Sequence, residues 1–247
     1  MTTHKQFIFG LHSVESLLNH HPERVIRLCV HQDRSDHRRE AIVQLALELG
    51  IAVEFVSKQE LERITQEATH QGVVAFCKKA RAYTEEDLKE WLEQLDTPPF
   101  ILVLDGVQDP HNLGACFRSA DAAGVHAIIA PKDKSVGITP VVSKVASGAT
   151  ETVPFVQVTN LARTLDMLKK AGIWIYGAAA EATQTVYETD LSGPVAMVLG
   201  AEGAGLRRLT REHCDVLVKI PMRGSVSSLN VSVAAGVFLF EVVRQRS

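Results

Sequence analysis

The sequence lacks the features that mark secreted, disulfide-stabilised and membrane-spanning proteins. Its four cysteines are scattered without a C-x-x-C spacing, which argues against a disulfide framework and predicts reduced thiols. No apolar run approaches the ~20 residues that a membrane-spanning helix needs. The first ten residues, MTTHKQFIFG, lack a basic start followed by an apolar core. We therefore expect no signal peptide and a cytoplasmic location.

A surplus of charge of one sign is also missing. Twenty-six lysines and arginines stand against 29 aspartates and glutamates, which gives a net charge of −3. Contact with a nucleic acid would therefore depend on local groups of cations, although such groups usually form ordinary solvated surface. The candidate groups are Lys78, Lys79 and Arg81; Arg34, Arg38 and Arg39; and Arg207, Arg208 and Arg211.

The 247 residues do contain enough apolar material for one large core or two smaller ones. With 46% apolar and 22% charged residues, the composition excludes a disordered chain. The hydrophobic periodicity switches repeatedly between that of a strand and that of a helix. This alternation predicts the α/β class, with a mostly parallel sheet that has helices on its faces.

A compact α/β unit precedes a charged stretch. The expected elements of this unit are helices at 11–18, at 42–49 and from Ser57, and strands at 26–30, 51–56 and 72–77. Residues 78–98 are charged and polar around one amphipathic helix at 84–95, which Thr97-Pro98-Pro99 closes. We therefore divide the chain into an N-terminal domain at 1–77, a linker at 78–98 and a second domain at 99–247.

Strands and helices continue to alternate in the second domain. The expected strands lie at 100–105, 126–130, 153–158, 173–179, 195–199 and 215–220. Helices are expected at 112–123, at 140–147, after Thr159 and from about 229 onward. In an open parallel sheet, ligands bind where loops leave the carboxyl ends of the strands. Three loops after these strands are unusual.

The first unusual loop runs from Leu104 to Gly114 and enters a helix. Asn112 suits the N-cap of that helix, and the apolar stripe that follows leaves Arg118 off the buried side. Taken alone, the two residues are explained equally well as a site and as an ordinary cap with a surface cation.

The second loop, from Gly200 to Gly205, places Glu202 among glycines directly after an apolar strand. Glycines allow positive φ and let a ligand approach the backbone closely. The spacing G-x-x-G-x-G is the reverse of the dinucleotide fingerprint, and no P-loop motif occurs. Taken alone, the loop is compatible with a nucleotide-like site and with a plain tight turn.

The third loop enters the last helix after Ile220. Ser228 and Asn230 stand at the start of this helix, where free backbone N–H groups gather. Capping explains one of these side chains. Two of them, together with Ser227 and Ser232, exceed what an internal helix entrance requires, so the pattern favours a functional role.

Together, the three loops resemble the motifs of the SpoU/TrmH branch of the SPOUT methyltransferases. The matching residues are Asn112-x-Gly114 with Arg118, Gly200-x-Glu202-Gly203-x-Gly205, and Ile220-Pro221-Met222 followed by Ser228-Leu229-Asn230. Similarity extends over nearly the whole chain. Within the family, the bacterial subgroup that methylates guanosine in large-subunit ribosomal RNA is similar in GLHSVESLL near the start, HQGVVA at 70–75 and DPHNLGACFRSADAAG at 109–124.

This resemblance implies a reaction, a fold and an assembly. Members transfer a methyl group from S-adenosylmethionine to a ribose 2′-hydroxyl of RNA, here that of a guanosine in 23S ribosomal RNA. Their catalytic domain is an α/β sheet whose C-terminal segment threads a deep trefoil knot, and their small N-terminal RNA-binding domain is L30e-like. A homodimer through the catalytic domain is expected, which the apolar character of the last helix also favours.

The resemblance also assigns residues to the site. Cofactor binding is assigned to Ala179, Gly200, Ile220, Met222 and Leu229, and catalysis to Asn112, Arg118, Glu202, Ser228 and Asn230. A guanidinium is effectively always protonated, so we interpret Arg118 as a clamp on the RNA phosphate and 2′-oxygen rather than as the general base. Asn112 and Ser228 would orient that group. Asn230 would support the loop, while Glu202 would fix the guanidinium or relay the proton.

No metal is expected, because no group of His, Cys and Asp in these loops has ligand spacing.

Two other classes of protein compete with a methyltransferase. A dinucleotide-dependent oxidoreductase fits the β/α order but lacks a fingerprint after the first strand. A non-catalytic RNA-binding protein would use the N-terminal domain alone, and the intact residues of all three loops count against it. Titration with S-adenosylmethionine and with NAD separates these classes.

Overall fold

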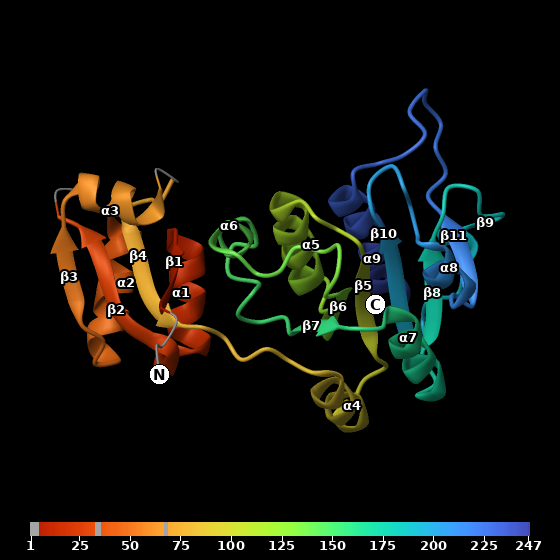
Figure 1. Cartoon of the computed structure of the whole chain (residues 1–247), viewed down its shortest axis with the longest axis horizontal. Coiled ribbons are helices and arrows are strands. Elements are labelled where there is room, and N and C mark those ends of the chain that lie inside the picture. Colours follow the sequence, from red (N-terminus) through yellow and green to blue (C-terminus); the bar gives the residue numbers. More distant parts are fainter. Residues whose placement is uncertain (1–4, 33–35, 67–68) are drawn as a thin grey trace. The chain divides into compact units, whose positions relative to one another are not determined.

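The computed structural model describes residues 5–32, 36–66 and 69–247, and it divides into two compact units (Figure 1). The first unit comprises the chain up to Arg81 together with Ile138–Thr152, and the second comprises Ala82–Gly137 and Val153–Ser247. The helix expected at 84–95 thus belongs to the second unit, and the segment around the helix expected at 140–147 belongs to the first. The division into functional domains at 77 and 99 stays a prediction.

The first unit is built on a four-stranded mixed sheet in the order β1-β4-β2-β3. Strand β4 is antiparallel to β1 and β2, whereas β3 is parallel to β2. The elements are β1 (Lys5–Phe9), α1 (Leu11–His20), η1 (Pro22–Arg24), β2 (Val25–His31), α2 (His37–Glu48), β3 (Val53–Val56), α3 (Lys58–Thr65) and β4 (Val73–Lys78). Strand β1 was not predicted from the sequence, because KQFIF is too short to show a clear hydrophobic period.

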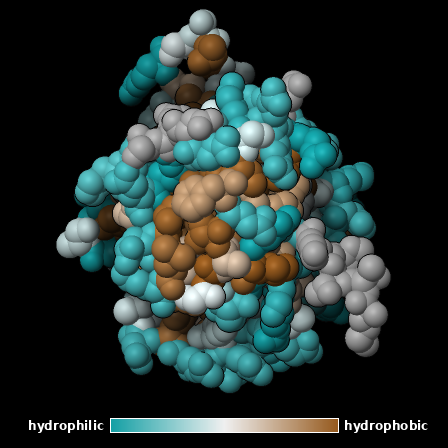
Figure 2. Space-filling view, turned by 90° about the vertical axis from the view of Figure 1, so that its left-hand side faces the viewer, coloured by the Kyte–Doolittle hydropathy of each residue, from teal (hydrophilic) through white to brown (hydrophobic). Residues whose placement is uncertain are grey.

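Two small cores hold this unit together, one on each face of its sheet. Helices α1 and α2 bury Leu17 and Ile42 against one face, and α3 buries Leu61 against the other. Apolar side chains also gather on the surface of this unit (Figure 2). Among its described residues, the large exposed apolar side chains are Ile26, Leu47, Leu49, Phe55 and Val141.

Residues 138–152, which include α6 (Pro140–Val145), pack in the first unit against α1 and β1. Ser13 Oγ donates to the carbonyl of Ser143 at 2.9 Å, and Ser16 Oγ donates to the carbonyl of Gly148 at 3.0 Å. Gly148 has φ +101°, and a Cβ there would lie 2.6 Å from Ser16 Cβ. Only glycine therefore lets this backbone lie so close to α1.

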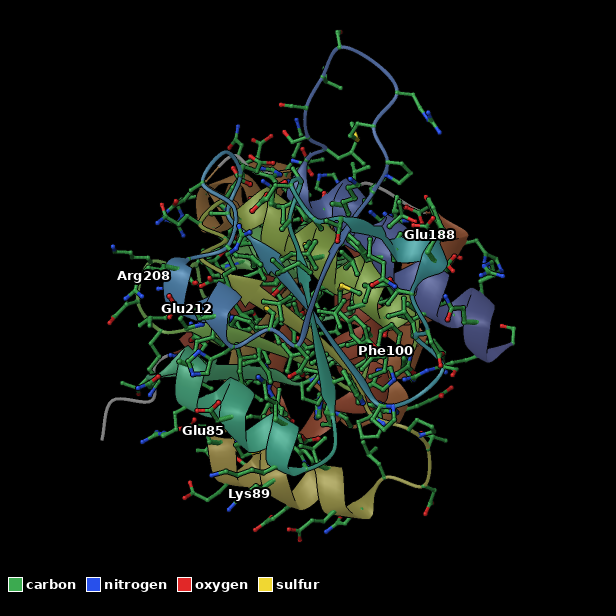
Figure 3. The ribbon with its side chains drawn as sticks, turned by 90° about the vertical axis from the view of Figure 1, so that its right-hand side faces the viewer. Glu85, Lys89, Phe100, Glu188, Arg208 and Glu212 are labelled. Atoms are coloured by element: carbon green, nitrogen blue, oxygen red, sulfur yellow. The ribbon has the colours of Figure 1, made fainter. Side chains whose placement is uncertain are left out.

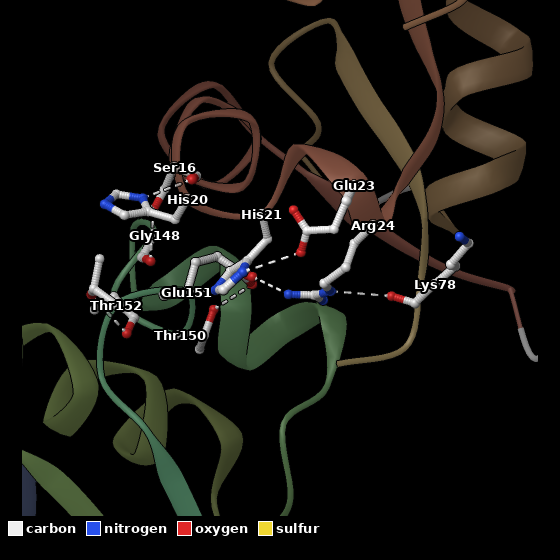
Figure 4. Close-up of polar contacts among 11 residues, drawn as sticks. Ser16, His20, His21, Glu23, Arg24, Lys78, Gly148, Thr150, Glu151 and Thr152 are labelled. Atoms are coloured by element: carbon white, nitrogen blue, oxygen red, sulfur yellow. Dashed lines mark hydrogen bonds and ion pairs between the residues drawn. The ribbon is translucent and has the colours of Figure 1, made fainter. Parts of the chain in front are cut away.

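A buried ion pair fixes the end of the same segment (Figure 4). The Glu151 carboxylate, 4% exposed, pairs with Arg24 Nη1, and the Arg24 side chain is 14% exposed. The ring of His21 lies with Nε2 3.1 Å from the carbonyl oxygen of Glu151. The segment is therefore held by hydrogen bonds along its length and by an ion pair at its end.

The second unit is a seven-stranded sheet in the order β7-β6-β5-β10-β8-β11-β9, and every strand pair in it is parallel. The strands are β5 (Phe100–Asp105), β6 (Ala127–Pro131), β7 (Phe155–Val158), β8 (Trp174–Ala178), β9 (Gln184–Thr185), β10 (Val195–Gly200) and β11 (Val216–Lys219). The helices are α4 (Glu85–Gln94), α5 (Pro110–Ala122), α7 (Leu161–Lys170), η2 (Val186–Glu188), α8 (Arg208–Glu212) and α9 (Val231–Arg246). The predicted α/β class with a mostly parallel sheet is confirmed.

Helices cover both faces of this sheet (Figure 3). On one face, Leu88 of α4 and Leu165 of α7 join the core formed by β5 and its neighbours. On the other face, α5 and α9 pack against each other. Strand β5 is buried along its whole length, as expected for a central strand of a parallel sheet with helices on both faces.

Two predicted helix starts are wrong. The N-cap of α5 is Asp109 and not Asn112, because Asp109 Oδ1 accepts from the backbone N–H groups of His111 and Asn112. Asn160, and not Thr159, caps α7 by accepting from Arg163 N at 3.1 Å. In both cases the capping side chain is an Asx residue other than the one chosen from the sequence, three positions earlier in α5 and one position later in α7.

All four cysteines are free thiols. Within residues 5–32, 36–66 and 69–247, no helix has both the length and the apolar character needed to cross a membrane.

Candidate active site

The three unusual loops leave the same edge of the parallel sheet. Strands β5, β10, β8 and β11 are neighbours, and all their carboxyl ends lie on this edge. Asp105 ends β5 opposite Gly200 of β10, while Ala179 and Ile220 directly follow β8 and β11. The chain between β11 and α9 extends beyond this edge (Figures 1 and 3). Such an edge is the usual ligand site of an open parallel sheet.

A polar cluster joins one residue from each loop. Asn230 Nδ2 donates to Asn112 Oδ1 at 2.9 Å and also to the carboxylate of Glu202. Glu202 Oε1 further accepts from the backbone N–H of Val231 at 3.4 Å. Asn112, Glu202 and Asn230 are thus brought together, although 118 positions separate the two asparagines.

Asn230 is held in place because it is also the N-cap of α9. Its Oδ1 accepts from Ser232 N at 2.9 Å and from Ser232 Oγ at 2.6 Å. With Oδ1 engaged by the helix, the amide nitrogen must point toward the cluster. The amide oxygen of Asn230 therefore caps α9, while its amide nitrogen binds Asn112 and Glu202.

Arg118 and Ser228 are not joined to this cluster. Both side chains are exposed, and within the described part of the chain neither makes a hydrogen bond or an ion pair. Glu202 contacts Asn230 and Val231 rather than Arg118. The guanidinium of Arg118 therefore keeps its hydrogen-bond donors available for a bound molecule.

The glycines of the second loop are required by the turn itself. A Cβ on Gly200 would lie 2.1 Å from both the carbonyl carbon and the oxygen of Gly205. Gly205 N donates back to Ala201 O at 2.9 Å, and Gly203 and Gly205 have φ of +75° and +66°. The loop is therefore a tight turn, and this turn leaves no room for a side chain where β10 ends.

Asp105 was not among the predicted site residues, and Arg207 was named only as a member of a candidate group of cations. The Asp105 side chain is completely buried and accepts from Arg207 N at 3.0 Å and from Arg207 Nε at 2.5 Å. Arg207 Nη2 also contacts this carboxylate. Two features of the sequence could have indicated this pair. One is a lone carboxylate at the end of an apolar strand, and the other is an arginine just after the glycine loop, residues 200–205.

The other two members of that cation group are also paired. Arg208 Nη1 lies 2.6 Å from Glu212 Oε1 on α8 (Figure 3), and Arg211 pairs with Glu181. The group at 207–211 is therefore a set of ion pairs rather than a free basic patch. Of the other groups, Arg34 lies outside the described residues.

The nearby cysteines do not supply a nucleophile. Burial raises the pKa of the Cys116 thiol in α5 to about 12, and it raises the pKa of Cys214, which follows α8, to about 12 as well. Both thiols stay protonated near neutral pH, and a thiol attacks only as its thiolate. Among the described residues, no group of three His, Cys, Asp or Glu side chains could hold a metal ion.

The residues assigned to cofactor binding offer backbone groups and apolar surface. Ala179, Ile220, Met222 and Leu229 are half-buried, and Gly200 lies between the ends of β5 and β8 in the sheet. Backbone N–H and C=O groups beside apolar side chains suit a ligand that has both a heterocycle and polar ends.

The family of this chain follows from comparison with known proteins. Residues 99–240 match the SpoU rRNA methylase family, and residues 7–83 match a domain described as RNA 2′-O ribose methyltransferase substrate binding. The chain belongs to the SpoU rRNA methylase family, as the motif resemblance predicted.

Close relatives match along their whole length. The 23S rRNA (guanosine-2′-O-)-methyltransferase RlmB of Pseudomonas putida is 57% identical over 97% of this chain and 96% of its own. The protein of the same name from Shewanella oneidensis is 57% identical over 98% of both chains. Among solved structures, an RNA 2′-O ribose methyltransferase is similar with a TM-score of 0.81 at 26% identity, covering 99% of this chain and 90% of its own. An AdoMet-bound rRNA methyltransferase from Sinorhizobium meliloti has a TM-score of 0.77 at 25% identity, covering 98% and 88%.

Proposed function

We propose that this protein transfers a methyl group from S-adenosylmethionine to the 2′-hydroxyl of a guanosine in 23S ribosomal RNA. Full-length relatives that are 57% identical carry this activity in their names. The observation that carries the proposal is the cluster of Asn112, Glu202 and Asn230 at the carboxyl edge of the sheet. An exposed guanidinium, Arg118, lies on the helix that carries Asn112.

The residues at this edge fit the cofactor. The turn packs Gly205 against Gly200, and the half-buried Gly200 offers its backbone groups to a ligand without a side chain. Half-buried Ile220, Met222 and Leu229 would hold the cofactor with Ala179 and Gly200. S-adenosylmethionine, when bound, supplies a methyl group on a sulfonium, which makes the methyl carbon electrophilic. The protein then has to place an alcohol oxygen in line with that carbon.

Arg118 acts on the RNA. Its planar, always charged guanidinium binds a phosphate oxygen and the reacting 2′-oxygen, so that it stabilises the negative charge that develops on that oxygen. Asn112 and Ser228 orient the ribose. Asn230 holds Asn112 and Glu202 in register, and the Glu202 carboxylate accepts or relays the proton that the 2′-hydroxyl loses.

The two units divide the work in this proposal. The first unit selects the RNA, which the match of residues 7–83 to a substrate-binding domain supports. Because the net charge is −3, few phosphate contacts are expected, and recognition relies on exposed bases and the 2′-hydroxyl. The second unit binds the cofactor and carries out the chemistry. A cytoplasmic location is inferred from this substrate.

We also infer a homodimer through the second unit. Helix α9 leaves Val233 and Phe240 about half exposed, at 53% and 48%. These apolar side chains on the helix that carries Asn230 at its start support an interface there. A monomeric mass by sedimentation, in a preparation that is still active, would contradict this.

The trefoil knot implied by the family resemblance is likewise a proposal. Strand β10 lies between β5 and β8, and α9 then returns to pack against α5. This interleaved order supports a threaded C-terminal segment. An experimental chain trace in which residues 195–247 pass through no loop would contradict the knot.

Mapping of 2′-O-methyl groups tests the proposed function directly. Ribosomal RNA from cells with and without the protein is compared, and purified protein with S-adenosylmethionine is added to RNA from the deficient cells. We expect one guanosine of 23S RNA to lose its methyl group and to regain it in vitro without an added metal. Unchanged methylation in the deficient cells, or transfer that requires a divalent ion with the RNA fold unaffected, would refute the corresponding part of the proposal.

A further inference from the structure

A completely buried carboxylate lies directly beside the candidate active site. The Asp105 side chain has no exposed surface, whereas the side chain of its partner Arg207 is 43% exposed. Asp105 accepts from the backbone N–H of Arg207 and from two nitrogens of its guanidinium. Both guanidinium nitrogens contact Asp105 Oδ1, while Oδ2 accepts from the backbone N–H. Charge-assisted hydrogen bonds are stronger than neutral ones, and these contacts hold both the backbone and the side chain of Arg207.

The two partners belong to different loops of the site. Asp105 ends β5 and begins the loop that leads to Asn112. Arg207 follows the loop that starts at Gly200 and carries Glu202. The pair therefore connects the base of the first loop to the exit of the second, across the register contact between Asp105 and Gly200.

The glycine loop needs such an anchor. Its contact at the other end, from Asn230 and Val231 to Glu202, involves an exposed carboxylate, where water competes for the same hydrogen bonds. The contact inside the loop, Gly205 N to Ala201 O, shapes the turn but does not attach it to the sheet. Asp105 supplies a buried attachment.

We propose that Asp105 and Arg207 are positioning residues for cofactor binding: the pair fixes the loop at residues 200–205 so that its backbone forms the cofactor site. This inference rests on the proposed function. The pair touches neither the methyl group nor the ribose, so its loss weakens cofactor binding and loosens the loop. The rate of chemistry at saturating cofactor and RNA changes little.

The test compares Arg207→Met, Arg207→Lys and Asp105→Asn with the wild-type full-length protein. Arg208→Met is the matched control, because it removes a neighbouring arginine whose ion pair with Glu212 is exposed. S-adenosylmethionine affinity is measured by calorimetry, amide hydrogen exchange of residues 201–206 is measured without ligand, and the single-turnover rate is measured at saturating cofactor.

Arg207→Met is expected to weaken S-adenosylmethionine binding about tenfold, the effect of losing one charge-assisted hydrogen bond, and to speed exchange in the loop. Asp105→Asn has the same effects in smaller measure, because its amide oxygen still accepts from Arg207 N. Arg207→Lys restores the charge but not the fork, so affinity recovers only in part. Single-turnover rates stay within about threefold of the wild type, as for groups outside the reacting atoms.

Affinity within about twofold of the wild type for both Asp105→Asn and Arg207→Met, with unchanged loop exchange, would overturn the proposal. Equal losses in Arg208→Met would overturn it too. If Arg207→Met does not fold, Asp105→Asn decides, since it leaves no buried charge unpaired. If the wild-type protein itself binds no S-adenosylmethionine, the proposed function is wrong. Amide hydrogen exchange of residues 201–206 without ligand then still tests whether Asp105 and Arg207 fix the loop.

Discussion

Each unit contains a buried carboxylate paired with an arginine, and two of these pairs, Arg24 with Glu151 and Arg207 with Asp105, differ in how exposed the arginine is. In the first unit, Glu151 and Arg24 are both withdrawn from water, at 4% and 14% exposure. In the second, Asp105 is completely buried while Arg207 is 43% exposed. The first pair fixes the end of segment 138–152 within a packed body. The second anchors a glycine loop at the edge of the sheet where the site lies.

The two pairs have different roles: one maintains the structure of the first unit, and the other arranges the loops of the candidate active site. Buried ion pairs are weak evidence for stability in themselves, since desolvation offsets much of their attraction. Their geometry is what they contribute. Arg24 and Glu151 serve the shape of the first unit, whereas Asp105 and Arg207 serve the arrangement of loops from which catalysis is proposed to follow. Substitutions in the first unit should therefore lower the free energy of unfolding, whereas substitutions in the second should lower the affinity for S-adenosylmethionine.

The largest contrast is expected between Gly200→Ala and Gly148→Ala. A Cβ at 200 would lie 2.1 Å from backbone atoms of Gly205, so the loop must open, and S-adenosylmethionine affinity should fall at least about a hundredfold. A Cβ at 148 would lie 2.6 Å from Ser16 Cβ, at φ +101°, which should destabilise the first unit by about 2 kcal/mol. Calorimetry and chemical denaturation measure the two effects.

Gly193→Ala is the control for this pair, because nothing lies within 4 Å of a Cβ there. It should leave both affinity and stability near the wild type. If Gly148→Ala reduced cofactor affinity as much as Gly200→Ala does, the proposed division between a structural role for the first unit and cofactor binding by the second would be wrong.

Breaking the Arg24 pair should have an intermediate effect. Arg24→Met leaves the Glu151 carboxylate buried without its cation, which is expected to cost about 3 kcal/mol of unfolding free energy. Adding Glu151→Gln should recover part of this loss, because it removes the unpaired charge. Lys58→Met, which removes an exposed pair with Glu62 on α3, should cost less than about 1 kcal/mol. Equal destabilisation by Arg24→Met and Lys58→Met would show that the buried pair has no special role.

The smallest effect concerns pH and a histidine of the second unit. Burial, and then the charge of Arg246, lower the pKa of His126 below its ordinary value of 6.5. Its Nδ1 accepts from Phe100 N at 3.0 Å, which requires an unprotonated nitrogen. The unfolded chain therefore binds more protons, so stability is complete above pH 6.5 and falls as the pH drops from there to the lowered pKa. Denaturation from pH 7.5 to 5.5 should show a slope that His126→Gln removes. An unchanged slope in the variant would assign the effect to other groups.

Much of the fold could be predicted from the sequence, because strands such as β5 and β10 are buried on both faces and read as unbroken apolar runs. Local capping was harder, since several Asx and Thr residues stand near each helix start. The place of 138–152 in the first unit could not be predicted at all. Its contacts with Ser13, Ser16 and Arg24 join residues about 130 positions apart, and no local pattern reports such a pairing.

Site residues that belong to a sequence motif could be predicted, whereas an isolated residue such as Asp105 could not. Asn112, Glu202 and Asn230 belong to recurring patterns, and they do lie together. Asp105 is one carboxylate at the end of a strand, with nothing in the sequence to connect it to Arg207. Register between β5 and β10 brings the two into contact, and register is a property of the fold rather than of a local segment.

Arg118 is proposed to act on the RNA oxygen rather than on the cofactor, and single-turnover methyl transfer by Arg118→Ala tests this role most directly. With S-adenosylmethionine saturating and 23S RNA from deficient cells as substrate, we predict a rate at least about a hundredfold below the wild type, with cofactor affinity within about twofold. Arg118→Lys should not restore the rate, because an ammonium cannot reproduce the planar fork. A near-normal single-turnover rate in Arg118→Ala would contradict the account.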